Sequence, residues 1–245
     1  PTNRPSQSCG PCTSADAGPR ARFQDCSAAL VPAVATPAIA GFGVGLDQLH
    51  NDSTTITSHG DYSGAAHEEA RKQQASLAIT WGHNKDHRPD LKQLLFILTV
   101  SKDGGVPIYF QAKSGNTADD QTHCATWDLL GTLAGRRDFL YVADCKLATA
   151  ENMAHVHQNG GRFLTLIPRT RREDRVFRES LSRGQVRSRS IYDKLDDDGE
   201  IVDEYSIRDE PALSAAGYRL VWYPSTRTAE TAAATRARDA ARAWG

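Results

Sequence analysis

The sequence has 245 residues, and its 29 lysines and arginines nearly balance its 30 aspartates and glutamates, for a formal net charge of −1. This length suits one large domain or one domain with an insertion. Because the charges nearly balance, the net charge of the chain does not by itself indicate binding to nucleic acid. The longest apolar run, residues 94–100, is too short to span a membrane, so we expect no membrane segment.

Residues 1–38 have the composition of a disordered or atypical N-terminal tail. Pro, Ser, Ala and Gly dominate, and we expect Pro32 and Pro37 to interrupt any helix in its apolar part. Cys9 and Cys12 have the spacing of a thioredoxin redox motif, but no strand or helix is predicted beside them to hold a thiolate. The five cysteines, at irregular spacings, favour a reducing cytoplasm over a disulfide framework.

Two β-rich segments each carry an aspartate, a residue that strands seldom contain. Residues 49–57 are rich in β-branched side chains and contain Asp52, and the apolar run 139–143 ends at Asp144. Aspartate is depleted in strands because it competes for backbone hydrogen bonds and is costly to bury. A solvent-facing aspartate on an edge strand is one interpretation of Asp52. Two strands that each supply a carboxylate predict instead a divalent-metal site built on a sheet.

The pattern between and after these segments alternates strands with two helices. Asp103 and Gly104 between two apolar runs are a strong hairpin signal, and a helix between two strands makes those strands parallel. We therefore predict a mixed sheet. In chain order, the expected elements are a strand at 74–81, a charged loop at 82–90, strands at 94–100 and 106–111, a helix at 119–133 closed by Gly135, a helix at 149–158 and a strand at 162–167.

This order of elements and several sequence blocks resemble the RNase H-like core of DDE transposases from bacterial insertion sequences. The resemblance is to the branch with a β-rich insertion between the second and third catalytic acids, and it covers roughly residues 40–225. The matching blocks are 49–55, 82–93, Pro107, 115–119, 142–144, 151–153 and 168–171. The resemblance implies an α/β fold with an RNase H-like mixed sheet flanked by helices and a β-rich insertion after Asp144.

The same resemblance implies a site in which two aspartates and one glutamate hold two Mg²⁺ ions, with Mn²⁺ as an alternative metal. Asp52 and Asp144 match the first and second acids, as metal ligands and as catalytic residues. The third should lie on a helix after the insertion. Its expected signature is absent around Glu230, so we interpret Glu230 as a solvated charge and leave the third acid unknown. We therefore expect the chain as given to be inactive in strand cleavage and transfer.

The implied partner is double-stranded DNA, both transposon ends and target, with a homodimer in the synaptic complex. Phosphate contacts are assigned to Lys85, His87, Arg88, Arg169 and Arg171. The alternative for these residues is a solvated loop and a solvated, arginine-rich helix. Two other functions stay open: a metal-dependent nuclease of similar core, and a catalytically dead remnant that at most binds DNA.

The implied organisation has four parts. They are the tail at 1–38, the first part of the catalytic core at 39–168, the β-rich insertion at 169–225, and the start of a C-terminal helix at 226–245, where the chain looks truncated. The start at Pro1 and the single methionine, Met153, also suggest an excerpt or a disrupted reading frame.

Overall fold

The computed structural model describes residues 34–65, 70–71, 74–75, 77–183, 187–208 and 214–244. The chain divides into two compact units, Pro1–Leu166 and Ile167–Gly245, and each is described by itself. The motif at Cys9 and Cys12 lies outside the described residues.

A five-stranded sheet forms the centre of the first unit, with the strand order β5-β4-β1-β6-β7. β1 lies in the middle, where it pairs antiparallel with β4 and parallel with β6. Asp52, on β1, therefore does not lie on an edge strand. The strands are β1 (Gln48–Ser58), β4 (Lys92–Ser101), β5 (Pro107–Ser114), β6 (Leu140–Ala143) and β7 (Arg162–Leu164).

The antiparallel half of the sheet is the hairpin of β4 and β5. Its turn contains Gly104 and Gly105, whose φ angles of 70° and 64° are in the left-handed region that glycine adopts without strain. The hydroxyl of Ser101 accepts a hydrogen bond from the backbone N–H of Val106 at 3.1 Å and closes the turn. The hairpin predicted from Asp103 and Gly104 is confirmed.

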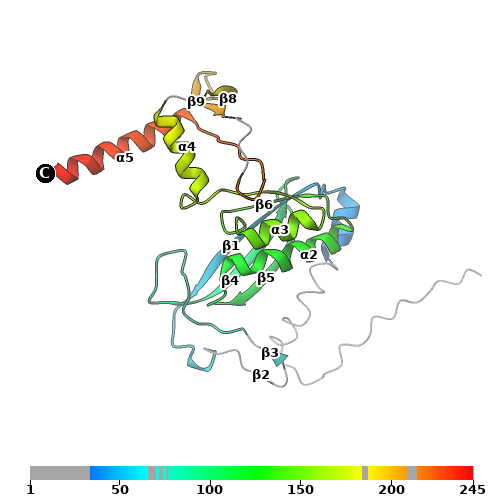
Figure 1. The fold of residues 1–245 in the computed structure, drawn as a ribbon. Helices are drawn as coiled ribbons and strands as arrows, with labels where there is room; N and C mark the ends of the chain where they lie inside the picture. The colour runs from blue at the N-terminus through cyan, green and yellow to red at the C-terminus, as the bar shows by residue number, and fades with distance from the viewer. Residues whose placement is uncertain are drawn as a thin grey trace, which may run out of the picture. The chain divides into compact units, whose positions relative to one another are not determined.

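Two helices cover one face of the sheet and form the crossovers that make β1, β6 and β7 parallel (Figure 1). They are α2 (His123–Ala134), which follows the 3-10 turn η2 (Asp119–Thr122), and α3 (Ala150–Gln158). Gly135 ends α2 with a φ of 65° and a bond from its N–H to the Thr132 carbonyl. Thr149 caps α3, because its hydroxyl accepts the Asn152 N–H at 3.1 Å. Both predicted helices are confirmed.

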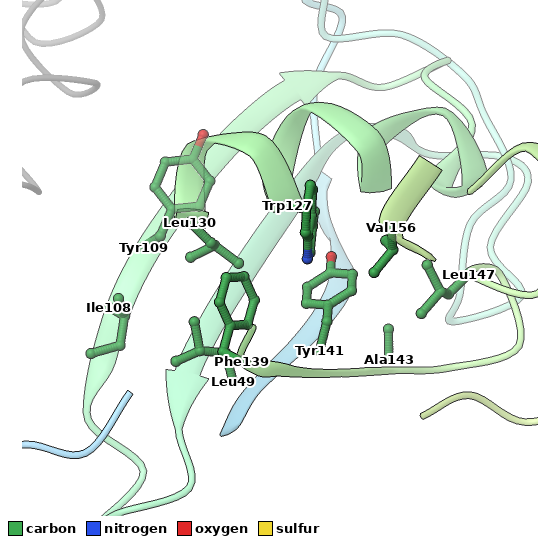
Figure 2. Packing of buried hydrophobic residues seen from close by; sticks show 10 residues of the cluster. All are labelled: Leu49, Ile108, Tyr109, Trp127, Leu130, Phe139, Tyr141, Ala143, Leu147 and Val156. Atoms are coloured by element: carbon green, nitrogen blue, oxygen red, sulfur yellow. The ribbon is translucent and has the colours of Figure 1, made fainter. Parts of the chain in front are cut away.

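The hydrophobic core lies between these helices and the sheet, as Figure 2 shows. Trp127 and Leu130 of α2 and Val156 of α3 are fully buried against Leu49 of β1 and Tyr141 of β6. Residues of β1 at odd positions up to Asn51 face this core, which leaves the even positions for the other face.

The face of the sheet away from α2 and α3 keeps partly exposed apolar side chains in the described part of the chain. Ile56 of β1 and Leu164 of β7 are 48% and 56% exposed. Phe96 and Phe110 stack on one another across β4 and β5, with ring centroids 5.8 Å apart. This side of the first unit is therefore less well packed than the helical side.

The described residues of the second unit form two helices and one antiparallel strand pair. They are α4 (Arg172–Ser182), β8 (Arg189–Leu195), β9 (Ile201–Ile207) and α5 (Thr226–Trp244). Phe177 of α4 stacks flat on Trp222, with ring centroids 3.7 Å apart. The carboxylate of Asp203 on β9 accepts the backbone N–H of Arg227 at 3.0 Å, so the strand pair fixes the first turn of α5.

The fold class predicted from the sequence is confirmed as an α/β fold with a mixed sheet flanked by helices. Three details of the prediction are wrong. Residues 34–42 are helical despite Pro37. Of the strand predicted at 74–81, Gln74–Ala75 is strand β3, but residues 77–81 have no regular strand and pair with β4 at the isolated bridge between Thr80 and Gln93. β7 ends at Leu164 rather than at residue 167.

Candidate metal site

The register of the two parallel strands brings the two aspartates side by side along the backbone. Asn51 pairs with Ala143 in the last row of the β1–β6 ladder, and Asp52 and Asp144 are the next residues. Neighbouring strands lie about 4.8 Å apart, so the backbones of the two residues run close to one another where β6 ends. β6 ends at Ala143, which puts Asp144 at the carboxyl end of its strand.

The two carboxylates have different surroundings. The Asp52 side chain is 82% exposed, and its Oδ1 accepts the N–H of Ser53 at 2.8 Å. Asp144 is half-buried, and its Oδ1 accepts the N–H of Lys146 at 2.9 Å. The Asp144 carbonyl also accepts the hydroxyl of Thr165 at 2.5 Å, which ties the end of β6 to the segment after β7. Each carboxylate therefore keeps lone pairs that these bonds do not use.

Lys85 of the charged loop reaches into this site. Its ammonium lies 3.8 Å from Oδ1 of Asp52 and 3.3 Å from Oδ2 of Asp119. It also donates to the carbonyl and to the hydroxyl of Ser53. The loop is held along β1 by the N–H of Lys85, which donates to the Thr55 hydroxyl at 3.3 Å. Lys85 was assigned to phosphate binding from the sequence, and in the structure its charge is engaged by carboxylates.

Asp119 is a further carboxylate at this site, and the sequence pattern alone predicts no role for it. It begins η2, and its side chain is only 14% exposed. Its position in the first turn before a helix was visible in the sequence, because acids favour helix N-termini. The signal that was missed is spatial, since the ion pair to Lys85 joins residues that are 34 positions apart in the sequence.

A buried histidine lies next to these acids at the start of α2. His123 Nδ1 is 3.1 Å from the hydroxyl of Tyr141. Burial lowers the pKa of His123, although the charges of Asp144 and Asp119 oppose this effect. Burial also raises the pKa of Tyr141 well above its ordinary value. The neutral forms of the His123 and Tyr141 side chains are therefore favoured.

Asn152 holds the segments around the site together. It is buried, and its side-chain amide donates to the carbonyl of Asp120 at 2.8 Å and accepts from the Cys124 thiol at 3.1 Å. Its backbone N–H is the one that Thr149 caps. These bonds join η2, α2 and α3. Asn152 belonged to one of the matching sequence blocks, and the structure gives it a positioning role.

The other residues assigned to phosphate binding lie on both units. In the first unit, Arg88 forms a two-point pair with Asp90, at 2.8 and 2.7 Å, and this hydrogen bonding lowers the pKa of Asp90 to about 2. His87 is exposed in a left-handed conformation, with a φ of 57°. In the second unit, Arg169 is exposed, and Arg171 precedes α4 with a buried Nε that has no hydrogen-bond partner in the described part of the chain.

The donor set suits a hard divalent cation. Carboxylate oxygens are the ligands that Mg²⁺ and Mn²⁺ prefer, and Mg²⁺ is commonly held by one or two carboxylates together with water and substrate phosphate. Asp52 and Asp144 supply two such carboxylates in one row. Within the described residues, no group of three or more acids, histidines or cysteines has the geometry to hold a metal by itself. The chemistry of the two carboxylates fits such an ion.

The solved structures that are similar to the chain include three transposase complexes. They are a Mos1 transposase paired-end complex with the left transposon end, a pre-cleavage Mos1 transpososome and a Mos1 mariner paired-end complex with Mn. Their sequence identities are 9%, 10% and 10%, over 68%, 74% and 74% of this chain, and each TM-score is 0.31. The chain covers 48%, 54% and 54% of those chains, or about half their length. A TM-score of this size does not establish common descent, so the fold assignment rests on strand order and register.

No protein-family model matches the sequence, and a search of curated proteins finds no match. Among the described residues, no helix is long and apolar enough to cross a membrane.

Proposed function

We propose that this chain carries the catalytic core of a DDE-type DNA transposase, in which Asp52 and Asp144 are the first two metal-binding acids. The observation that supports the proposal is the β1–β6 register, which sets the two aspartates in adjacent positions at the end of a central strand pair. The chemistry is metal-dependent cleavage and transfer of DNA strands at the ends of an insertion sequence. The partners are double-stranded DNA and a second copy of the chain.

Each group of residues has a stated task in this proposal. Asp52 and Asp144 hold Mg²⁺ or Mn²⁺, and a bound ion stabilises the charge that develops on the scissile phosphodiester. Asn152 keeps η2, α2 and α3 in place around the acids. Basic side chains of each unit bind DNA phosphates: His87 and Arg88 in the first unit, and Arg169 and Arg171 in the second. The third acid is not assigned.

DNA binding with and without a divalent ion tests this function. Two carboxylates repel phosphate, and an ion between them attracts it, so Ca²⁺ should strengthen binding of a labelled DNA duplex without allowing cleavage. Asp144→Asn should bind DNA more tightly than the unaltered chain in EDTA and should lose the response to Ca²⁺. Asp103→Asn, which removes the same charge in the β4–β5 turn, is the control and should behave like the unaltered chain. An equal Ca²⁺ response in Asp144→Asn would contradict the proposal.

A cleavage assay separates the nuclease alternative from this function, and the Ca²⁺ response of DNA binding separates the dead remnant. A nuclease of similar core cuts supercoiled plasmid in Mn²⁺ without joining strands, and a dead remnant does neither. We expect the chain as given to leave the plasmid intact, because two carboxylates fix only part of a two-ion site. Cleavage that is lost in Asp144→Asn would show that a third acid is present, and Glu230, exposed on α5, is then the first residue to replace.

A further inference from the structure

The ammonium of Lys85 is held by the protein on several sides. The ammonium donates to the carbonyl and hydroxyl of Ser53 and forms ion pairs with the carboxylates of Asp52 and Asp119. The Lys85 side chain is 32% exposed, so it is partly withdrawn from water. This cation is therefore part of the acidic site, and its position does not depend on a DNA phosphate.

The two ion pairs of Lys85 are unequal. The pair with Asp119 is shorter, 3.3 Å against 3.8 Å, and the Asp119 side chain is far less exposed than that of Asp52, 14% against 82%. A buried, shorter pair is less screened by water than an exposed, longer one. Asp119 and Ser53 therefore hold the ammonium in place, and its ion pair with Asp52 is the weaker one and breaks first.

We propose that the Lys85 ammonium is the built-in counter-ion of this acidic site, and that a divalent cation binds by taking Asp52 away from it. This inference rests on the proposed metal site. A cation on Asp52 and an ammonium 3.8 Å from the same carboxylate repel one another, so the ammonium must withdraw toward Asp119. Lys85 thus offsets the charge of Asp52 when no ion is present, and it lowers the affinity for the ion.

The test is a titration with Mn²⁺ alone, in which electron paramagnetic resonance reports the free ion. Lys85→Met should bind Mn²⁺ about two- to fivefold more tightly than the unaltered chain. The reason is that the Lys85 ammonium no longer competes with Mn²⁺ for Asp52, and a partly exposed ion pair of this kind contributes a free energy of that size. Lys85→Arg keeps the charge and should not gain affinity. Lys102→Met, in the β4–β5 turn, removes an equal charge away from the site and is the matched control. Lys85→Gln serves if the methionine variant unfolds.

Equal or weaker binding in both Lys85→Met and Lys85→Gln would overturn the counter-ion role. The same titration separates this failure from failure of the metal site itself. Asp52→Asn added to Lys85→Met should abolish the tight binding. If tight binding persists in that double variant, the ion lies elsewhere, and both the metal site and the inference built on it are overturned.

Discussion

Asn51 of β1 and Ala143 of β6 form the last residue pair of the parallel ladder at the middle of the sheet, and each is followed by an aspartate. The consequence is a row of two acids at the point where β6 ends and β1 continues. Beyond this row, Lys85 donates its N–H to the Thr55 hydroxyl, so the charged loop lies beside the part of β1 that β6 does not reach.

The first prediction concerns stability with and without metal. Two neighbouring carboxylates repel, and a ligand that binds only the folded state raises the melting temperature. We expect MnCl₂ to raise the melting temperature of the unaltered chain relative to EDTA. Asp144→Asn, which keeps an acceptor for the Lys146 N–H, should be at least as stable in EDTA and should not respond to MnCl₂. Asp103→Asn is the control, and a full MnCl₂ response in Asp144→Asn would count against the site.

The second prediction concerns two glycines that hold the start of the charged loop. A Cβ on Gly115 would lie 2.0 Å from the Gln93 carbonyl oxygen, and one on Gly82 would lie 1.9 Å from the Gly115 carbonyl oxygen. Backbone atoms cannot yield as a flexible side chain does, so Gly82→Ala and Gly115→Ala should each lower the free energy of unfolding by about 1–3 kcal/mol or more. Denaturant unfolding measures this. Gly41→Ala, where a Cβ meets nothing within 4 Å, should change little.

The extent to which the sequence predicted the structure depends on how local each signal is. Gly135 and Thr149 end and begin helices through bonds within a few residues, and both were predicted. The segment at 77–81 looked like a strand by composition. It is instead held by long-range contacts, among them the bond from the Gly115 N–H to the Ala78 carbonyl at 3.0 Å, which no local pattern encodes.

The same distinction applies to the site. Asp52 and Asp144 were found because each lies in a strand-like segment where an acid is unusual, and their adjacency follows from strand order. The ion pair between Lys85 and Asp119 was not found, because it depends on how a loop packs against η2. Lys85 consequently looked like a free phosphate ligand in the sequence.

The third prediction concerns acid in the second unit. The pKa of Asp203 is lowered, chiefly because its carboxylate accepts the Arg227 N–H, with a further bond from the Thr226 hydroxyl. A depressed folded-state pKa adds stability that is present above the unfolded value near 4 and is lost as pH falls through the folded value. Asp203→Ala should therefore lower the melting temperature at pH 7 and flatten its fall below about pH 4. Asp197→Ala, in the exposed β8–β9 turn, should leave both unchanged.

The fourth prediction concerns phosphate binding by the second unit. Each phosphate contact that is lost reduces the slope of log affinity against log salt by about 1. Replacing Arg169 and Arg171 by alanine should therefore weaken binding to any DNA duplex and reduce the slope by about 2. The control replaces Lys102 and Arg136, of which Arg136 already pairs with Asp47 at 2.6 Å. An unchanged slope in the Arg169 and Arg171 variant would show that these two arginines are solvated side chains that do not bind DNA phosphates.

The most direct test of the central claim is anomalous scattering from crystals of the chain grown with Mn²⁺. The account predicts an anomalous peak between the carboxylates of Asp52 and Asp144, at metal–oxygen distances of about 2.0–2.3 Å, with the Lys85 ammonium drawn back toward Asp119. Such a peak should be absent from Asp144→Asn crystals grown in the same way. Carboxylates more than about 10 Å apart, or Mn²⁺ bound only at other residues, would contradict the account, because no pair of ions in one site bridges that separation.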